Sequence, residues 1–201
     1  MKEEKQKVGQ IRKKEIREVA KKIFLTKGFQ STTMEDVITE IGMSRGGVYY
    51  HYRSKVEILH DLMREGMAYR MAKMNSFMAD YSSELGKEAI ADMLVDRMLD
   101  ENELMSIYVM YLQAIKDNDE LKELYSILKE ETLYSAYGGD INGVKLGDFR
   151  WNTTDFILYF MNAIILGCEI LEARNNFRKN RDFLIKVIML YFDYYDEGKI
   201  K

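Results

Sequence analysis

The sequence contains no proline, one cysteine and two histidines in 201 residues. Because proline breaks helices, its absence, together with abundant Leu, Met, Glu and Lys, favours an all-α protein. The lone Cys168 excludes an internal disulfide and fits a reducing cytoplasm. His51 and His60 have no carboxylate or thiol placed to complete a site, so we predict no metal, no cofactor and no catalytic residue.

Long apolar runs are also missing. No stretch is long and uncharged enough to span a membrane. The first 20 residues, MKEEKQKVGQIRKKEIREVA, lack the apolar core of a signal peptide. A chain of this length can bury a sizeable core and form one or two small domains. We therefore expect a cytoplasmic protein without a membrane segment.

The net charge of −3 is unevenly distributed. Residues 1–60 carry 13 Lys and Arg against 8 Asp and Glu, whereas the remainder carries 17 against 25. A basic N-terminal part on an acidic body is typical of a nucleic-acid-binding head. A charged, solvated first helix would give the same imbalance, so the split supports this interpretation only beside a binding motif.

Such a motif lies in residues 27–59, which read KGFQSTTMEDVITEIGMSRGGVYYHYRSKVEIL. Thr33 is placed to cap a short helix, with Asp36 completing the start. Gly42 can end that helix in the left-handed conformation, and Ser44 can cap the next one. Two short helices joined by a turn that contains glycine form the helix-turn-helix layout.

The second of these helices has an unusual surface. Its first turn combines the cation of Arg45 with two glycines, each of which costs about 1 kcal/mol in a helix relative to Ala. Such a cost is reasonable where the backbone must approach another surface closely, and DNA is the best candidate. Tyr49 has an alternative role in the core. The predicted DNA-binding residues are Thr33, Ser44, Arg45, Gly46, Gly47, Tyr49, Tyr50, His51 and Lys55.

Individual roles follow from the chemistry of the side chains. Arg45 is the best candidate for reading a base, because its guanidinium matches the O6/N7 edge of guanine. Ser54 and Glu57 predict a capped helix start, where free N–H groups favour a phosphate. Lys55 would add a cation there, although a purely solvated lysine is the simpler alternative.

The same stretch resembles the DNA-binding domain of the TetR (tetracycline-repressor-like) family of transcriptional regulators. The matching features are Gly28-Phe29, Thr32-Thr33, Asp36-Val37, Ile41-Gly42, Ser44, Gly46, Tyr49, Tyr52 and Ser54-Lys55, preceded by Ile16, Ala20, Ile23 and Phe24. Ile38 and Gly47 depart from the family's usual residues. The resemblance covers roughly the first 60 residues.

The resemblance implies an all-α protein of about nine helices, with a DNA-binding domain at residues 1–54 and a ligand-binding and dimerisation domain at 55–201. It also implies a homodimer, most often a repressor, that binds a palindromic operator and is released by a small hydrophobic or aromatic effector. Movement of the helix that begins at Lys55 would transmit the effector's binding to the head.

Beyond the motif the sequence predicts a series of helices. Their expected ranges are 55 to about 81, 87–99, 104–116, about 119–134 after a cap at Asn118, about 153–175, and about 181–195 after a cap at Asn180. The segment AYGGDINGVKLGDFRWN is expected to be a loop, because it contains four glycines and no helical period.

Methionines recur along one face of the helix that follows Lys55, at Met63, Met67, Met71, Met74 and Met78. An ordinary core stripe is one interpretation; a pliable pocket wall is the other, since Met adapts to varied partners. Aromatic residues of the body could complete such a pocket. The predicted ligand-binding residues are Met67, Met71, Met105, Tyr108, Tyr111, Tyr125, Trp151, Tyr159 and Phe160.

The last two predicted helices are apolar on more than one face, which is typical of buried or interfacial helices. They suggest a four-helix bundle across a two-fold axis. Ala163 and Gly167 would allow close approach of two helices, although an internal crossing would use them equally well. The predicted dimer-interface residues are Ala163, Gly167, Phe183, Val187, Tyr191 and Tyr194.

Two other functions remain open from the sequence. One is a DNA-bound adaptor regulated by a protein partner rather than a small ligand. The other is a helical enzyme that uses a pocket in the body, although no nucleophile–base pair, metal spacing or phosphate loop supports it.

Overall fold

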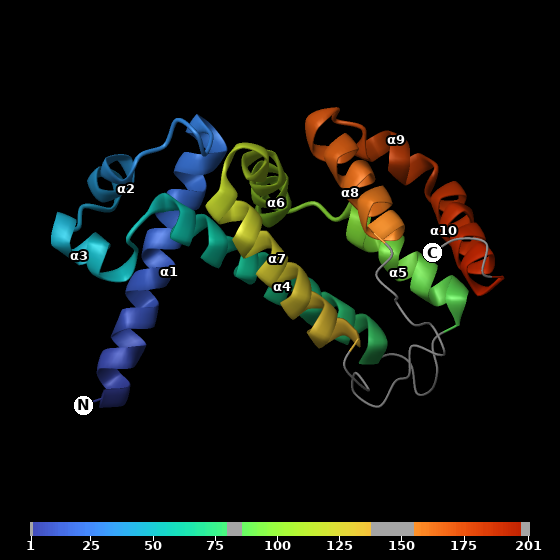
Figure 1. Cartoon of the computed structure of the whole chain (residues 1–201), viewed down its shortest axis with the longest axis horizontal. Coiled ribbons are helices and arrows are strands. Elements are labelled where there is room, and N and C mark those ends of the chain that lie inside the picture. The colour runs from blue at the N-terminus through green and yellow to red at the C-terminus, as the bar shows by residue number, and fades with distance from the viewer. Residues whose placement is uncertain (1, 80–85, 138–154, 198–201) are drawn as a thin grey trace. The chain divides into compact units, whose positions relative to one another are not determined.

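The computed structural model describes residues 2–79, 86–137 and 155–197. Within these ranges the chain is helical without a strand, which confirms the predicted all-α class (Figure 1). The elements are α1 (Lys2–Lys27), α2 (Met34–Ile41), α3 (Arg45–His51), α4 (Lys55–Ala79), α5 (Lys87–Leu99), α6 (Glu103–Ala114), the 3-10 helix η1 (Ile115–Asp117), α7 (Asp119–Tyr137), α8 (Asp155–Ile170), α9 (Arg174–Lys179) and α10 (Arg181–Asp196).

Packing divides the chain into two compact units. The head unit comprises Met1–Met67 and Ser106–Lys129, and the body unit comprises Ala68–Met105 and Glu130–Lys201. Three helices, α4, α6 and α7, therefore begin in one unit and end in the other. This division describes packing; the predicted functional boundary between residues 54 and 55 stays a prediction.

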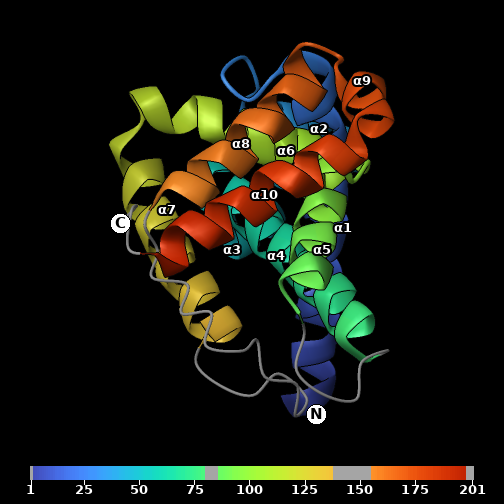
Figure 2. The ribbon, with the colours of Figure 1, turned by 90° about the vertical axis from the view of Figure 1, so that its right-hand side faces the viewer.

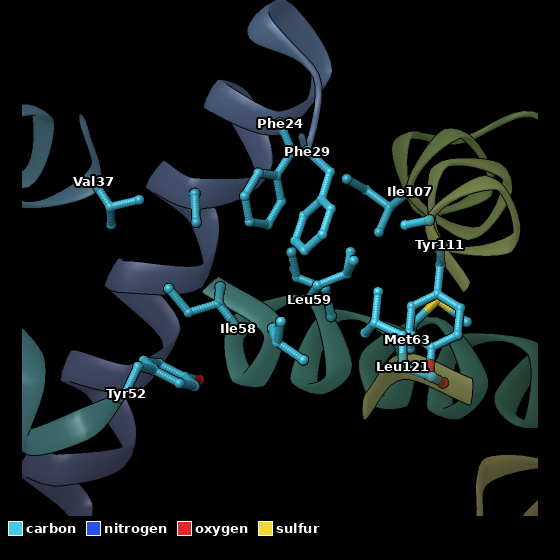
Figure 3. Close-up of a cluster of buried hydrophobic side chains, with 14 of the residues drawn as sticks. Phe24, Phe29, Val37, Tyr52, Ile58, Leu59, Met63, Ile107, Tyr111 and Leu121 are labelled. Atoms are coloured by element: carbon cyan, nitrogen blue, oxygen red, sulfur yellow. The ribbon is translucent and has the colours of Figure 1, made fainter. Parts of the chain in front are cut away.

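The head unit is built around apolar side chains from six helices (α1, α2, α3, α4, α6 and α7) and from the loop after α1 (Figure 3). The Phe24 and Phe29 rings meet edge to face with centroids 5.4 Å apart. Tyr111 of α6 is fully buried and donates its hydroxyl to the carbonyl oxygen of Leu121 at 3.1 Å. Burial raises the pKa of Tyr111 to about 12, so this phenol stays a neutral donor within the core.

The body unit packs α5 against both α8 and α10 (Figure 2). The Phe156 ring of α8 stacks on the Tyr191 ring of α10, with centroids 5.6 Å apart. Arg174 of α9 is buried and donates to the carbonyl oxygens of Leu99 and Asp100, at the end of α5, and to the Glu169 carboxylate. The guanidinium thereby satisfies carbonyls that a helix end leaves open.

The described residues contain ten α-helices, one more than the predicted number of about nine. The helix expected to run to about residue 175 ends at Ile170. Glu172 then takes a left-handed φ of 53°, and the amides of Leu171 and Ala173 both donate to the Gly167 carbonyl. This closing turn makes α9 a separate helix.

Two predicted caps have different outcomes. Asn118 does cap α7, since its side-chain oxygen accepts from the Leu121 amide at 3.0 Å. The prediction for Asn180 is wrong: its side-chain amide donates backwards to the Asn176 carbonyl at 2.9 Å. Of the predicted loop AYGGDINGVKLGDFRWN, the part from residue 138 onward lies outside the described residues.

Candidate nucleic-acid interface

The turn between α2 and α3 is formed by the caps that the sequence predicts. Thr33 caps α2: its hydroxyl oxygen accepts from the Asp36 amide at 3.2 Å, and the Asp36 carboxylate accepts from the Thr33 amide at 2.7 Å. Gly42 ends the helix with a φ of 67°. Ser44 caps α3 by accepting from the Gly47 amide at 3.2 Å. These contacts fix α3 relative to α2.

The outer surface of α3 is open to solvent. Tyr50 is 85% exposed, and its ring meets the His51 ring edge to face. Arg45 is also exposed, with its guanidinium carbon 5.8 Å from the centre of the Tyr49 ring. A Cβ atom built at Gly46 would have no neighbour within 4 Å. The missing side chain therefore leaves the backbone at this position accessible from outside. An exposed aromatic and cationic surface on the second helix is suited to the major groove of DNA.

Gly47 has a structural role that differs from that of Gly46. A Cβ atom built at Gly47 would lie 3.1 Å from the Ser44 hydroxyl oxygen that caps the helix. A larger residue would crowd this cap. Tyr49 is half-buried and Val48 is buried, so α3 turns one face into the head unit while it presents the other.

The end of α3 is held by a hydrogen-bonded network that the sequence did not predict. Tyr52 donates its hydroxyl to Asp61 of α4 at 2.9 Å and accepts from Arg17 of α1 at 3.1 Å. Arg17 also pairs with Glu65 of α4 at 3.1 Å. Burial raises the pKa of Tyr52 well above its usual value. The network ties the presented helix to α1 and α4, which fixes its orientation.

Lys55 has a different role from the one predicted. Its ammonium group donates to the carbonyl oxygens of Phe29 at 2.8 Å, Gln30 at 3.0 Å and Thr32 at 2.7 Å, and lies 4.7 Å from the centre of the Phe29 ring. An ammonium group has three donors, and all three are used here. Partial burial lowers the pKa of Lys55. Lys55 therefore positions the loop between α1 and α2 in this structure.

We expect Lys55→Met to destabilise the head unit by about 1–3 kcal/mol, because the loop carbonyls lose charged hydrogen bonds. Urea unfolding measures the change. The matched control is Lys22→Met, an exposed lysine of α1, for which we expect a change within about 0.5 kcal/mol. Equal stability of the two variants would return Lys55 to the role of a phosphate contact.

Asp36 carries several contacts at the start of α2. Its carboxylate accepts from the Lys27 ammonium at 2.7 Å and from the amide and hydroxyl of Thr33. These hydrogen bonds, with that of Lys27 the strongest, lower the pKa of Asp36 to about 2. The Thr33 hydroxyl is therefore already committed as a donor, and a phosphate would have to displace this contact.

The lowered pKa of Asp36 predicts a pH effect. A depressed pKa means that the ionised carboxylate stabilises the folded state above its unfolded pKa near 3.8, and that this contribution disappears as the pH falls toward about 2. The urea midpoint of Asp36→Asn should therefore lie below that of the wild type at pH 6, and the difference should shrink as the pH falls below 3.8, with most of it lost at about pH 2. A constant difference over this range would contradict the assignment.

The predicted ligand-binding residues are divided between the two units. Met67, Tyr108, Tyr111 and Tyr125 belong to the head unit, whereas Met71, Met105, Tyr159 and Phe160 belong to the body unit. Tyr111 is a core residue, and Met63 and Met67 pack in the same core. Tyr159 is 63% exposed. Trp151 and the side chain of Met78 lie outside the described residues.

The predicted dimer residues also separate into two groups. Gly167 and Tyr191 face inward: a Cβ at Gly167 would lie 3.1 Å from the Phe177 ring of α9, and Tyr191 is buried beneath Phe156. Val187 is half-buried. The remaining predicted dimer residues, Ala163, Phe183 and Tyr194, are exposed. Three further exposed residues of the same two helices were not among the predicted dimer residues: Phe156, Tyr159 and Leu190. We call these six residues the α8/α10 apolar face.

Spacing alone could have identified this face. On α8 its members recur at intervals of three and four residues, and on α10 Phe183, Leu190 and Tyr194 follow a helical repeat of seven and four. Both intervals place the side chains on one side of their helix.

Two other properties concern the described part of the chain alone. None of its helices has the length and apolar character needed to cross a membrane. Its histidine, cysteine and acidic side chains likewise form no cluster of three that could hold a metal ion.

Comparison with known proteins places the motif in a family. Residues 16–62 match the family model described as bacterial regulatory proteins, tetR family. The transcriptional regulator YfiR of Bacillus subtilis is 32% identical over 113 residues, which cover 56% of this chain and 55% of YfiR. YerO of the same organism is 24% identical over 79% of this chain and 58% of YerO. The chain thus spans little more than half the length of these relatives.

Solved structures share the fold. Salmonella enterica GusR aligns with a TM-score of 0.65 at 18% identity, covering 88% of this chain and 93% of GusR. A Saccharomonospora viridis protein assigned as a transcriptional regulator and solved with choline aligns with a TM-score of 0.57 at 17% identity, covering 90% of this chain and 95% of that one. Identities this low establish the fold alone.

Proposed function

Because this chain is a transcriptional regulator of the TetR family, we propose that it is a cytoplasmic, homodimeric repressor that binds a palindromic operator. The observation that carries the proposal is the exposed face of α3, where Arg45 and Tyr50 project from a helix whose start and end are both held in place. Two such helices in one dimer would enter successive major grooves, since two-fold symmetry in the protein matches two-fold symmetry in the operator.

Within this proposal, Arg45 reads a guanine and the other polar groups of α3 contact phosphates. A bidentate arginine–guanine contact contributes about 1–3 kcal/mol of discrimination. Phosphate contacts fix the position of the head without reading sequence. The Ser44 hydroxyl accepts from Gly47 and keeps its own proton for a phosphate oxygen. Lys55 makes no direct contact with DNA in this proposal, because its three donors are engaged by carbonyl oxygens of the head unit.

The dimer is supported by the α8/α10 apolar face. Large exposed apolar patches on a folded chain mark interaction sites, and Phe183, at 65% exposed, and Tyr159, at 63%, lie on the two helices joined by the Phe156–Tyr191 stack. Burial of this face against a second copy would form a bundle of four helices. In this arrangement Tyr159 is an interface residue rather than a pocket residue.

Release by a small effector is the remaining part of the proposal. An effector that binds the DNA-free conformation more tightly would shift the population away from the operator-bound state. Met71 and Met105 in the body unit stay candidates for contacts with a hydrophobic or aromatic molecule. The structural relative solved with choline suggests testing quaternary ammonium compounds, which aromatic rings can bind through cation–π contacts.

The function is tested by selecting bound sequences from random duplex DNA with the purified protein. A palindromic consensus with half-sites about one helical turn apart is expected. Arg45→Ala should then lose preference for one guanine in each half-site. Sedimentation of the wild type as a dimer, and of Phe183→Asp as a monomer, would support the assembly. Failure of the wild type to enrich any sequence would refute the proposal.

A further inference from the structure

The exposed ion pair between α2 and α3 lies on the surface of the head unit that we propose to contact DNA. The Arg45 Nη2 atom lies 3.0 Å from the Glu35 Oε1 atom, and the side chains are 71% and 57% exposed. The guanidinium carbon is 5.8 Å from the centre of the Tyr49 ring. The guanidinium is therefore held by a carboxylate of α2 and the ring of a residue one turn along α3.

The ion pair itself adds too little stability to explain this arrangement, although a carboxylate in the first turn of α2 is favoured by the helix dipole. Exposed ion pairs contribute little to folding, because water and salt screen both charges. Glu35 stands in the first turn of α2 beside Asp36, whose charge is matched by Lys27. A carboxylate at this position also opposes the approach of DNA phosphates, so it lowers the affinity for every sequence.

Glu35 thus holds the Arg45 guanidinium in place and opposes the DNA phosphates. Both effects favour discrimination between DNA sequences over affinity for DNA in general. Arginine loses considerable side-chain freedom when it is ordered, and prior ordering reduces that loss on binding. Glu35 engages one terminal nitrogen of the guanidinium and leaves other donors for a base. Where Arg45 does not contact a guanine, the negative charge of Glu35 still faces the DNA phosphates and weakens the complex. Contacts between like charges disfavour wrong partners in the same way.

We propose that Glu35 is a specificity-determining residue, which acts by positioning Arg45 for its base contact. The inference rests on the proposed DNA-binding function. Sequence spacing gives no sign of it, because the two positions are ten apart on separate helices and the pairing depends on how α2 and α3 are placed on α1.

The test measures affinities of the wild type and Glu35→Gln for the selected operator, for versions changed at single base pairs, and for an unrelated duplex. We expect Glu35→Gln to bind the unrelated duplex several-fold more tightly. Its preference for the guanine read by Arg45 should fall about threefold or more relative to the wild type, whereas its preferences at other base pairs stay the same. The thermal midpoint should stay near that of the wild type, because the pair is exposed.

Glu40→Gln is the matched control. Glu40 lies at the other end of α2, in a concavity that it shares with Glu18 and Ile41, and its substitution changes the charge equally. In an Arg45→Ala background, Glu35→Gln should have no effect beyond that of Glu40→Gln.

The outcomes separate the two proposals. If the wild type enriches no sequence, the proposed DNA-binding function fails. If the wild type selects an operator but Glu35→Gln and Glu40→Gln have the same base-pair preferences, Glu35 is only part of the general charge and this inference is overturned. A loss of preference spread evenly over all base pairs would overturn it as well.

Discussion

Arg174→Met should destabilise the body unit by about 3–5 kcal/mol, the range expected when one partner of a buried ion pair is removed. Arg174 and Glu169 are both largely shielded, with side chains 10% and 14% exposed. Without the guanidinium, the Glu169 carboxylate and the carbonyls at the end of α5 would lose their shared donor. Urea unfolding followed by circular dichroism measures the loss.

Arg178→Met provides the control for this change. Arg178 stands one turn along the same helix and pairs with Glu101 at 2.9 Å, but the two side chains are 45% and 67% exposed. We expect a loss of no more than about 1 kcal/mol. Similar losses for the two variants would mean that burial does not distinguish the two arginines, and the interpretation of Arg174 as the anchor of α5 would be wrong.

The second large effect is expected in the head unit. Phe24 is fully buried and meets Phe29 edge to face. Phe24→Ala should destabilise this unit by about 3–5 kcal/mol, through the loss of apolar contact and the cavity left behind. Ile11→Ala, at a position 49% exposed on the same helix, should change stability by no more than about 0.5 kcal/mol.

This substitution also tests the separation of the two units. Phe24 belongs to the head unit, whereas the α8/α10 apolar face belongs to the body unit. Phe24→Ala should therefore weaken DNA binding strongly near the temperature at which the head unfolds, while sedimentation still finds the proposed dimer. Loss of the dimer together with the head would show that the units do not unfold independently.

Much of the head could be predicted from local sequence because its determinants are local. The caps at Thr33 and Ser44 and the left-handed Gly42 each depend on residues within four positions, and each is confirmed. Helix ends in the body were less predictable. The break between α8 and α9 depends on Glu172 adopting a left-handed φ, which a non-glycine residue rarely does, so no sequence pattern pointed to it.

The site residues also divide into those that local sequence predicted and those that depend on packing. The types of residue identified the exposed groups of α3, since an arginine and two glycines are rarely found together in the first turn of a purely structural helix. It assigned Lys55 to a phosphate because the residue begins a helix, whereas packing brings its ammonium group to three loop carbonyls more than 20 residues away in sequence. Gly167 likewise proved to be a contact with Phe177 within the chain.

The sequence by itself determined the helical class, the helix-turn-helix and the chemical character of its reading helix, because caps, turns and periodicity act between near neighbours. Only the tertiary structure decided which charged and apolar groups face one another. It paired Glu35 with Arg45, buried Arg174 at the end of α5 and left Phe156, Phe183 and Leu190 exposed. Such pairings depend on how separate helices pack, and side-chain spacing along one helix carries no record of its neighbours.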